Sequence, residues 1–241
     1  MATATITATY QGQIKRQDTS TSTINWLSTT RNATTGTSAT TFSVGTSTSV
    51  RSEYTLQKGT YYSINERVFL FFDLSSINGT ITSADLKVYN PSTVSNTDDI
   101  DCVEASAWGG DGSSSTLTTS DYDNVAFLGT GPAYAALLSW SSLSYNTFTI
   151  GAAGISAMNS DGYLNCALVT EDYDYKGENL TLGQDINFAM RAKDGSNPIY
   201  LDITYTPQTG YSHGVNGVGS SSIVSVNTVA TASITNIIGV S

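Results

Sequence analysis

The chain has 241 residues, of which 12% are charged, and it carries a formal net charge of -10. Nucleic-acid binding needs clustered Lys and Arg, so this acidic balance excludes a role that follows a phosphate backbone. The same charge disfavours an anionic membrane surface, and no run of about 18 apolar residues is present to span a bilayer. Abundant Thr, Ser and Gly favour strands and tight turns over helices.

The amino-terminal segment predicts a strand. Residues 3–10 (TATITATY) alternate in polarity over eight positions, which is the period of a half-buried strand. Met1 to Gln13 has no basic region followed by an apolar stretch, so we expect a chain made in a host cytoplasm without a secretory signal. Residues 18–60, rich in Thr and Ser, predict short strands and loops.

The strongest local pattern lies between Arg67 and Asn90. Its first run, VFLFFDL, is apolar at nearly every position and predicts a central strand covered on both faces. Its second run, Ala84–Tyr89, alternates in polarity. Asn78-Gly79 lies between the two runs and predicts a chain reversal.

Further short apolar segments, separated by turn residues, predict an all-β fold. The candidate strands are Ile100–Ala105, Thr147–Ile150, Tyr163–Val169, Ile186–Arg191 and Ile199–Thr206. Only Ala152–Asn159 suggests a helical turn. We therefore predict a jelly-roll-like antiparallel β-sandwich over residues 1–206, followed by a tail at 207–241.

The two cysteines, Cys102 and Cys166, each lie in an apolar strand-like segment. In a chain without an export signal, this placement predicts reduced thiols in the core more than a disulfide.

Four groups of segments, in this order, resemble the DNRLRE-type domain, a β-sandwich relative of carbohydrate-binding modules in bacterial and archaeal surface proteins. They are RVFLFFDL with INGTITSADLKVY (67–89), CVEASAW (102–108), NTFTIGAAGI with GYLNCAL (146–168), and NFAMR with NPIYLDITYT (187–206). The resemblance implies a sandwich over about residues 60–206. It implies no sugar-binding residues, because Arg191 is followed by Ala192 where the family often has Glu and the second core Trp motif is indistinct.

Residues 207–241 contain no Asp, Glu, Lys or Arg, and short Val- and Ile-containing motifs recur there at a spacing of 11. Repeats of this kind predict short strands that need a neighbour to cover them, and a solvated linker is the alternative. The tail resembles the C-terminal repeats of many tailed-phage structural proteins. The expected assembly interface comprises Val215, Val218, Ile223, Val226, Val229, Ile234, Ile237 and Val240.

Catalytic motifs are scarce in this sequence. His213 is the one histidine and lies in a Gly-rich stretch, which excludes multi-histidine zinc sites and His-based triads in the core. The densest carboxylate clusters are Asp98-Asp99-Asp101, Asp121-Asp123 and Glu171-Asp172-Asp174, and we expect them to be solvated turn residues. No loop matches an EF-hand, although oxygen-rich loops leave a structural calcium possible; no other cofactor is expected.

The sequence favours a non-enzymatic virion structural protein: a capsid decoration, head-fibre or tail-associated component. Its expected partners are other virion proteins or copies of itself, with no nucleic acid and no membrane. The alternative is a carbohydrate-binding module or adhesin that recognises a surface glycan. For that alternative we expect contacts from Tyr173, Tyr175 and Trp140, with both tyrosines exposed, while Trp108 packs in the core.

Overall fold

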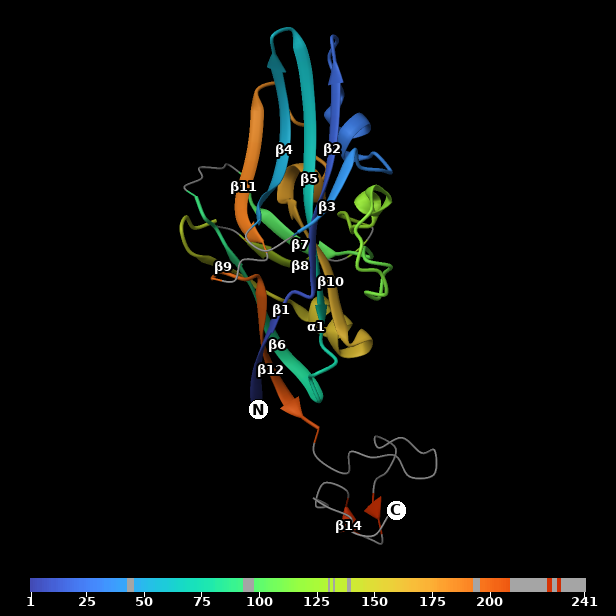
Figure 1. Ribbon diagram of the computed structural model, residues 1–241, viewed down its shortest axis with the longest axis vertical. Coiled ribbons are helices and arrows are strands. Elements are labelled where there is room, and N and C mark those ends of the chain that lie inside the picture. Colours follow the sequence, from blue (N-terminus) through green and yellow to red (C-terminus); the bar gives the residue numbers. More distant parts are fainter. Residues whose placement is uncertain are drawn as a thin grey trace.

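The computed structural model describes residues 1–42, 46–92, 98–129, 131, 133–137, 140–192, 196–208, 225–226 and 229–230. Two antiparallel sheets pack face to face and run along the long axis of the molecule (Figure 1). The predicted all-β sandwich is confirmed. Its strands extend from β1 near the amino terminus to β12, which ends at Pro207.

The smaller sheet has four strands in the order β1-β12-β6-β9. These are β1 (Ala2–Thr7), β12 (Tyr200–Pro207), β6 (Gly79–Tyr89) and β9 (Tyr145–Thr149). The larger sheet has the order β11-β4-β5-β10-β7-β8, and β2 pairs with both β5 and β3. Its strands are β2 (Tyr10–Ser20), β3 (Ser38–Thr41), β4 (Thr46–Gln57), β5 (Thr60–Asp73), β7 (Ile100–Glu104), β8 (Ala133–Leu137), β10 (Tyr163–Thr170) and β11 (Gln184–Ala192).

The strand expected at residues 3–10 is divided between the two sheets. Ala8 donates a backbone hydrogen bond to Ile199, which directly precedes β12 of the small sheet, at 3.1 Å. Thr9 donates one to Phe71 of β5 in the large sheet at 2.8 Å. The alternating pattern continues through this point because the chain stays extended while it changes partner. The polarity pattern therefore identified the strand but not its end.

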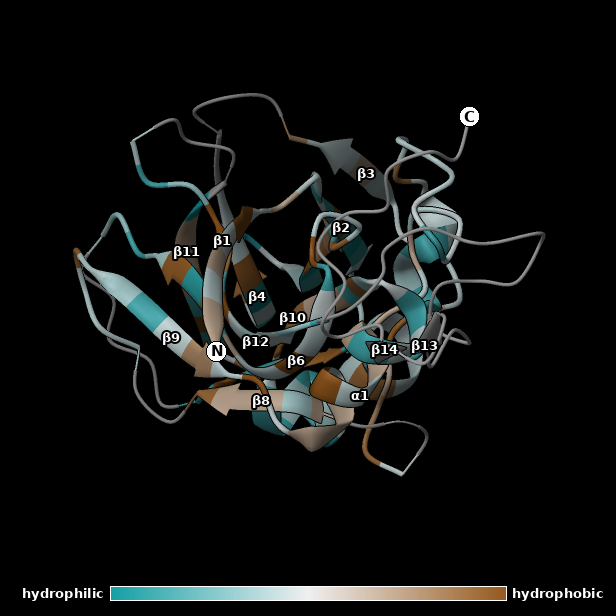
Figure 2. Cartoon of the chain, turned by 90° about the horizontal axis from the view of Figure 1, so that it is seen from below, coloured by the Kyte–Doolittle hydropathy of each residue, from teal (hydrophilic) through white to brown (hydrophobic). Residues whose placement is uncertain are grey.

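Strand β5 is the centre of the large sheet, and the expectation that both its faces are covered is confirmed. Val68, Leu70 and Phe72 face the core between the sheets, whereas Phe69 and Phe71 belong to a second apolar cluster on the outer face. Along the axis of the molecule, the strands surround a common interior, with hydrophobic stretches on β4, β6 and β11 (Figure 2).

The chain passes from the large sheet to the small sheet between β5 and β6, so Asn78-Gly79 does not close a hairpin of paired strands. Gly79 lies opposite Pro207 in the β6–β12 ladder. A Cβ atom at position 79 would stand 2.2 Å from the carbonyl oxygen of Thr206. Glycine is required here by the close approach of another backbone.

The expected helical turn is confirmed as α1 (Ala152–Asp161), which ends at Gly162 with φ +75°. Helix α1 packs against β6, β8 and β10, and it places Met158 in the main core. The other predicted strands correspond to β7, β9, β10, β11 and β12. The sequence patterns missed β2 beyond its first residue, the length of β4, and β8.

Cys102 and Cys166 are both buried and free, as expected, on the neighbouring strands β7 and β10. A hydrogen bond between the two thiols, together with burial, holds the pKa of Cys102 well above its ordinary value. The thiols therefore act as small apolar side chains.

Candidate functional site

A buried polar cluster occupies the outer face of the large sheet, centred on Arg67 of β5 and Asp174. Both side chains are fully buried, and Arg67 donates from Nε to Oδ2 of Asp174 at 2.8 Å and from Nη2 to Oδ1 at 2.7 Å. The guanidinium also lies 4.0 Å from the ring centroid of Tyr122. This two-pronged pair joins a strand to a segment 107 residues away in the sequence.

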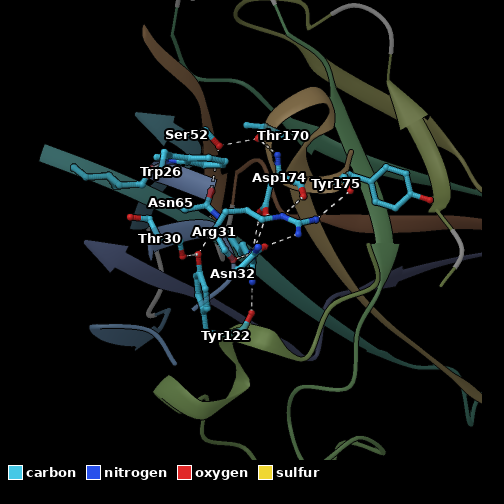
Figure 3. Close-up of polar contacts among 12 residues, drawn as sticks. Trp26, Thr30, Arg31, Asn32, Ser52, Asn65, Tyr122, Thr170, Asp174 and Tyr175 are labelled. Carbon is cyan, nitrogen blue, oxygen red and sulfur yellow. Dashed lines mark hydrogen bonds and ion pairs between the residues drawn. The ribbon is translucent and has the colours of Figure 1, made fainter. Parts of the chain in front are cut away.

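Three short helical turns converge on this cluster: η1 (Leu27–Arg31), η2 (Thr119–Asp123) and η3 (Glu171–Tyr175). Figure 3 shows Arg31, Tyr122 and Asp174, one from each turn, directed toward a common centre. Arg67 donates to the carbonyl oxygens of Arg31 and Tyr122, and Tyr122 donates its hydroxyl to Thr30 at 2.9 Å. The cluster therefore holds three surface segments against the sheet.

Arg67 and Arg31 both lie beside the Asp174 carboxylate, and Arg67 and Asp174 are shielded from water. Burial, the largest single effect, would lower the pKa of Arg67. The electrostatic effects of Asp174, Tyr122 and Asp123 and the hydrogen bonds to Asp174 together outweigh it, and the net pKa is raised. Burial raises the pKa of Tyr122, so its phenol stays protonated. A charge pair that is fully buried and saturated with hydrogen bonds is a structural element, because substrate cannot reach it.

The acidic clusters of the sequence are not all solvated turns, which corrects that expectation. Asp101 lies in β7 and is 3% exposed, Asp98 is 8% exposed, and Asp174 is fully buried. The fold brings the cluster at residues 98–101 beside the cluster at residues 171–174, where Oδ1 of Asp98 accepts a hydrogen bond from the backbone N–H of Asp172 at 3.1 Å. Strand order in the large sheet, with β7 next to β10, produces this contact.

Two carboxylate oxygens in this region, Oδ2 of Asp98 and Oδ1 of Asp101, are buried without a hydrogen-bond partner among the described residues. Burial raises the pKa of Asp98 to about 6 and that of Asp101 to about 7, and the neighbouring Glu171 adds to both. Lys176 is the nearby cation, and it binds Glu171 and Asp172 instead. Across the described residues, no three His, Cys, Asp or Glu side chains are arranged to hold a metal ion. The structural calcium stays a prediction.

Three neighbouring hollows lie along the large sheet. The first, about 390 Å³, is lined by residues that include Tyr10 of β2, Phe71 of β5 and Tyr163 of β10. The rings of Phe71 and Tyr163 stack at a centroid distance of 5.2 Å, and Tyr10 lies 5.8 Å from Phe71. Register explains this row, since Tyr10 pairs directly with Phe71 and Tyr163 pairs with Asp73.

The other two hollows are linked to the first by shared lining residues. The middle one, about 170 Å³, shares Asp161 and Tyr163 with the first hollow. The last, about 320 Å³, shares residues 104–106 with the middle one. We name the three hollows together the tyrosine groove. Its carboxylates are Asp73, Asp111, Asp161, Glu104 and Asp123, and none of the described residues that line it is Lys, Arg or His.

Tyr173, Tyr175 and Trp140 are all half-buried, so the two tyrosines are less exposed than expected, and their contact with a glycan stays a prediction. Trp140 packs against Phe148 and Phe188 at the edge of the main core. Tyr173 is half-buried, and its hydroxyl accepts a hydrogen bond from Gln184 at 2.8 Å. Tyr175 is half-buried against the outer apolar cluster. The acidic residues around these tyrosines suggested exposure to solvent, whereas η3 directs both rings toward the apolar clusters. Trp108 is fully buried, as expected.

The expected assembly interface lies almost wholly outside the described residues, as does His213. Only Val226 and Val229 are described there, in β13 (Ser225–Val226) and β14 (Val229–Ala230), where they pair with each other. Within the described part of the chain, these strands join no other sheet. The positions not described are Val215, Val218, Ile223, Ile234, Ile237 and Val240.

Sequence reasoning missed the tyrosine groove because its residues are scattered. Tyr10 and Tyr163 each begin a strand, and Asp111 lies in a Gly-rich loop. One signal was available. Tyr10, Phe71 and Tyr163 each lie an even number of residues from other outward-facing positions of their strands, so they share the outer face of the sheet.

No protein-family model matches the chain, and no curated protein matches it. The resemblance to DNRLRE-type domains therefore stays a prediction. No helix in the described ranges has the length and apolar character needed to cross a membrane.

Proposed function

We propose that this protein is a non-enzymatic structural component of a virion-type assembly, joined to its neighbours through its carboxy-terminal tail. One observation carries the proposal: every charged residue lies within residues 1–206, whereas residues 207–241 have none. A segment that repeats Val and Ile without any charge gains stability when a partner covers it.

The described tail residues support the same reading. Strands β13 and β14 contain two residues each and pair only with each other in the described chain. An isolated pair of this length is at best marginally stable in water, so we expect further strands to cover it. Strand addition by a second copy or by another virion protein supplies them.

The sandwich body also supports a structural role. Its most polar buried group, the Arg67–Asp174 pair, holds loops in place and is inaccessible to substrate. The body therefore acts as a rigid module carried by the tail.

The test compares the full chain with a chain that ends at Gln208, whose backbone N–H donates to the carbonyl oxygen of Asn78 in the body. We expect the full chain to form oligomers in sedimentation equilibrium and the truncated chain to be a folded monomer. A truncated chain with the same oligomeric state as the full chain would contradict the proposal.

A matched pair of variants separates packing from chain length. Val226→Lys with Val229→Lys places two charges at the repeated apolar positions, and Ser221→Lys with Ser222→Lys places two at polar positions. We expect only the first pair to abolish association, because it buries charge in an apolar contact. Equal loss in both variants would mean that net charge, and not packing, controls assembly.

A further inference from the structure

The middle hollow of the tyrosine groove has an unused hydrogen-bond acceptor in its wall. Asn165 of β10 lines this hollow and is 4% exposed. Its Nδ2 donates to the carbonyl oxygens of Ala107 at 2.6 Å and Gly110 at 2.9 Å, so the orientation of the amide is fixed. Its Oδ1 has no hydrogen-bond partner among the described residues. A buried acceptor without a partner costs free energy, which a ligand with a donor group recovers.

Two carboxylates line the same hollow. Glu104 of β7 and Asp161 of α1 come from different elements, and both residues are exposed to solvent. Burial and then the charge of Glu104 raise the pKa of Tyr134, another residue of the lining. Asp161 adds to this rise, and after burial it also raises the pKa of Tyr163. The two charges therefore act on one small volume, and a cation that enters it is attracted by both.

An aromatic ring forms part of the wall between the middle and first hollows. Tyr163 lines both hollows and is half-buried, so part of its ring is accessible. Its other contacts fix the ring, because it stacks on Phe71 at a centroid distance of 5.2 Å. The face of a tyrosine ring attracts an ammonium group, and its apolar surface packs against methylene groups.

The first hollow adds to the negative charge and selects against anions. Hydrogen bonds from Ser75 lower the pKa of Asp73, and hydrogen bonds from Ser113 lower that of Asp111, so both carboxylates are ionised at neutral pH. None of the described residues that line the three hollows is basic. The lining therefore repels phosphate, sulfate and carboxylate ligands and favours cations.

We propose that the middle hollow binds a primary ammonium group on an alkyl chain, which donates to Asn165, Glu104 and Asp161. A primary ammonium has three donors and no acceptor, which matches in number the three acceptor side chains of the lining. The alkyl chain then extends along Tyr163. A Lys side chain of a partner polypeptide and a free diamine share this chemistry. The tail at residues 207–241 has no Lys, so it cannot supply the ligand, and the site is independent of the tail.

The experiment measures binding to the full-length chain by isothermal titration calorimetry, at about physiological ionic strength to screen unspecific attraction. The probes are hexalysine, 1,5-diaminopentane and hexalysine acetylated on every side-chain amine. We expect an amine probe to bind and the acetylated peptide to give no heat. Tighter binding of hexalysine identifies a polypeptide source, and tighter binding of the diamine identifies a small-molecule source.

Two variants with the same change in net charge separate this site from general attraction to an acidic protein. Glu104→Gln with Asp161→Asn should weaken amine binding by about tenfold, because each lost charge contact contributes on the order of 1 kcal/mol. Glu178→Gln with Asp202→Asn is the matched control, since both residues are exposed and neither lines the three hollows. The control should keep the affinity of the unchanged chain.

A second pair of variants tests the ring. Tyr163→Leu removes the aromatic face and should weaken binding by about fivefold, and Tyr163→Phe should recover most of that loss. Thermal unfolding should show that every variant is folded. The proposal is overturned if neither amine binds, if the acetylated peptide binds as tightly as hexalysine, or if the two charge variants lose affinity equally.

Discussion

The outer faces of the two sheets differ in how their polar residues are satisfied. On the large sheet, the turns η1, η2 and η3 cover the strands, and polar side chains such as Arg67 and Asn65 are buried and bonded. On the small sheet, Asp202 and Asp85 bond to threonines in the exposed or partly exposed outer layer. Polar contacts such as Arg67–Asp174 are buried on one face, whereas contacts such as Thr5–Asp202 are exposed to solvent on the other.

This difference is already visible in the strands. Strand β6 alternates between buried and accessible residues, as expected for a sheet with one face toward water. Strands β5 and β10 are buried along most of their length, because covering segments lie over their outer face. The covered face therefore holds its polar side chains in fixed positions, whereas the open face leaves many of them in contact with water.

The largest expected effect breaks the covered face at its centre. Asp174→Ala leaves the Arg67 guanidinium buried without its partner, and we expect the free energy of unfolding to fall by about 3–5 kcal/mol. Asp202→Ala, on the open face, should change it by no more than about 0.5 kcal/mol. Urea unfolding followed by tryptophan fluorescence measures both. Similar small losses in the two variants would refute the contrast between the faces.

A second prediction concerns the loop that lies on Phe71. Gly110 and Gly112 both have positive φ, but a Cβ atom meets Phe71 only at Gly112 and meets nothing within 4 Å at Gly110. Each change to Ala should cost about 1 kcal/mol for the left-handed backbone. Gly112→Ala should cost about 1–3 kcal/mol more, because it overpacks the ring. Thermal unfolding of the two variants decides this, and equal losses would show that the loop moves freely away from the sheet.

The smallest effect comes from Asp98 and Asp101, whose folded-state pKa values are about 6 and about 7. Because these values lie above the ordinary value of an Asp, the folded state binds more protons than the unfolded state between roughly pH 4 and pH 7. Stability is therefore greatest at the acidic end of this window and falls as the pH rises through it. We expect a loss on the order of 1–2 kcal/mol after solvent screening.

Asp101→Asn should remove much of this pH dependence, and urea unfolding at pH 5 and pH 8 measures it. The surrounding charges of Asp99, Glu171, Asp172 and Lys176 stay the same in that variant. A stability that rises from pH 5 to pH 8 in the unchanged chain would mean that these carboxyls are ionised and paired in the folded state.

Much of the fold could be predicted from local pattern. Burial on one or both faces of a strand produces a recognisable polarity pattern in the sequence. This pattern predicted the apolar run of β5, the alternation in β6 and the short strands β7, β10, β11 and β12. The same rule failed for residues 3–10, since a strand that changes sheets keeps its period. It also failed for Tyr173 and Tyr175, because a short helical turn rich in acidic residues has the same sequence pattern as a solvated loop.

The sequence by itself determined the β class, the central strand, the position of α1 and the uncharged tail, because composition and short-range periodicity express burial directly. Only the tertiary structure decided that Arg67 meets Asp174, that Asp98 lies beside Asp172, and that Tyr10, Phe71 and Tyr163 form one row. Those neighbours come from the order and register of strands far apart in the chain. Pairing between distant strands is selected by the packing of the whole core, which no local window of residues contains.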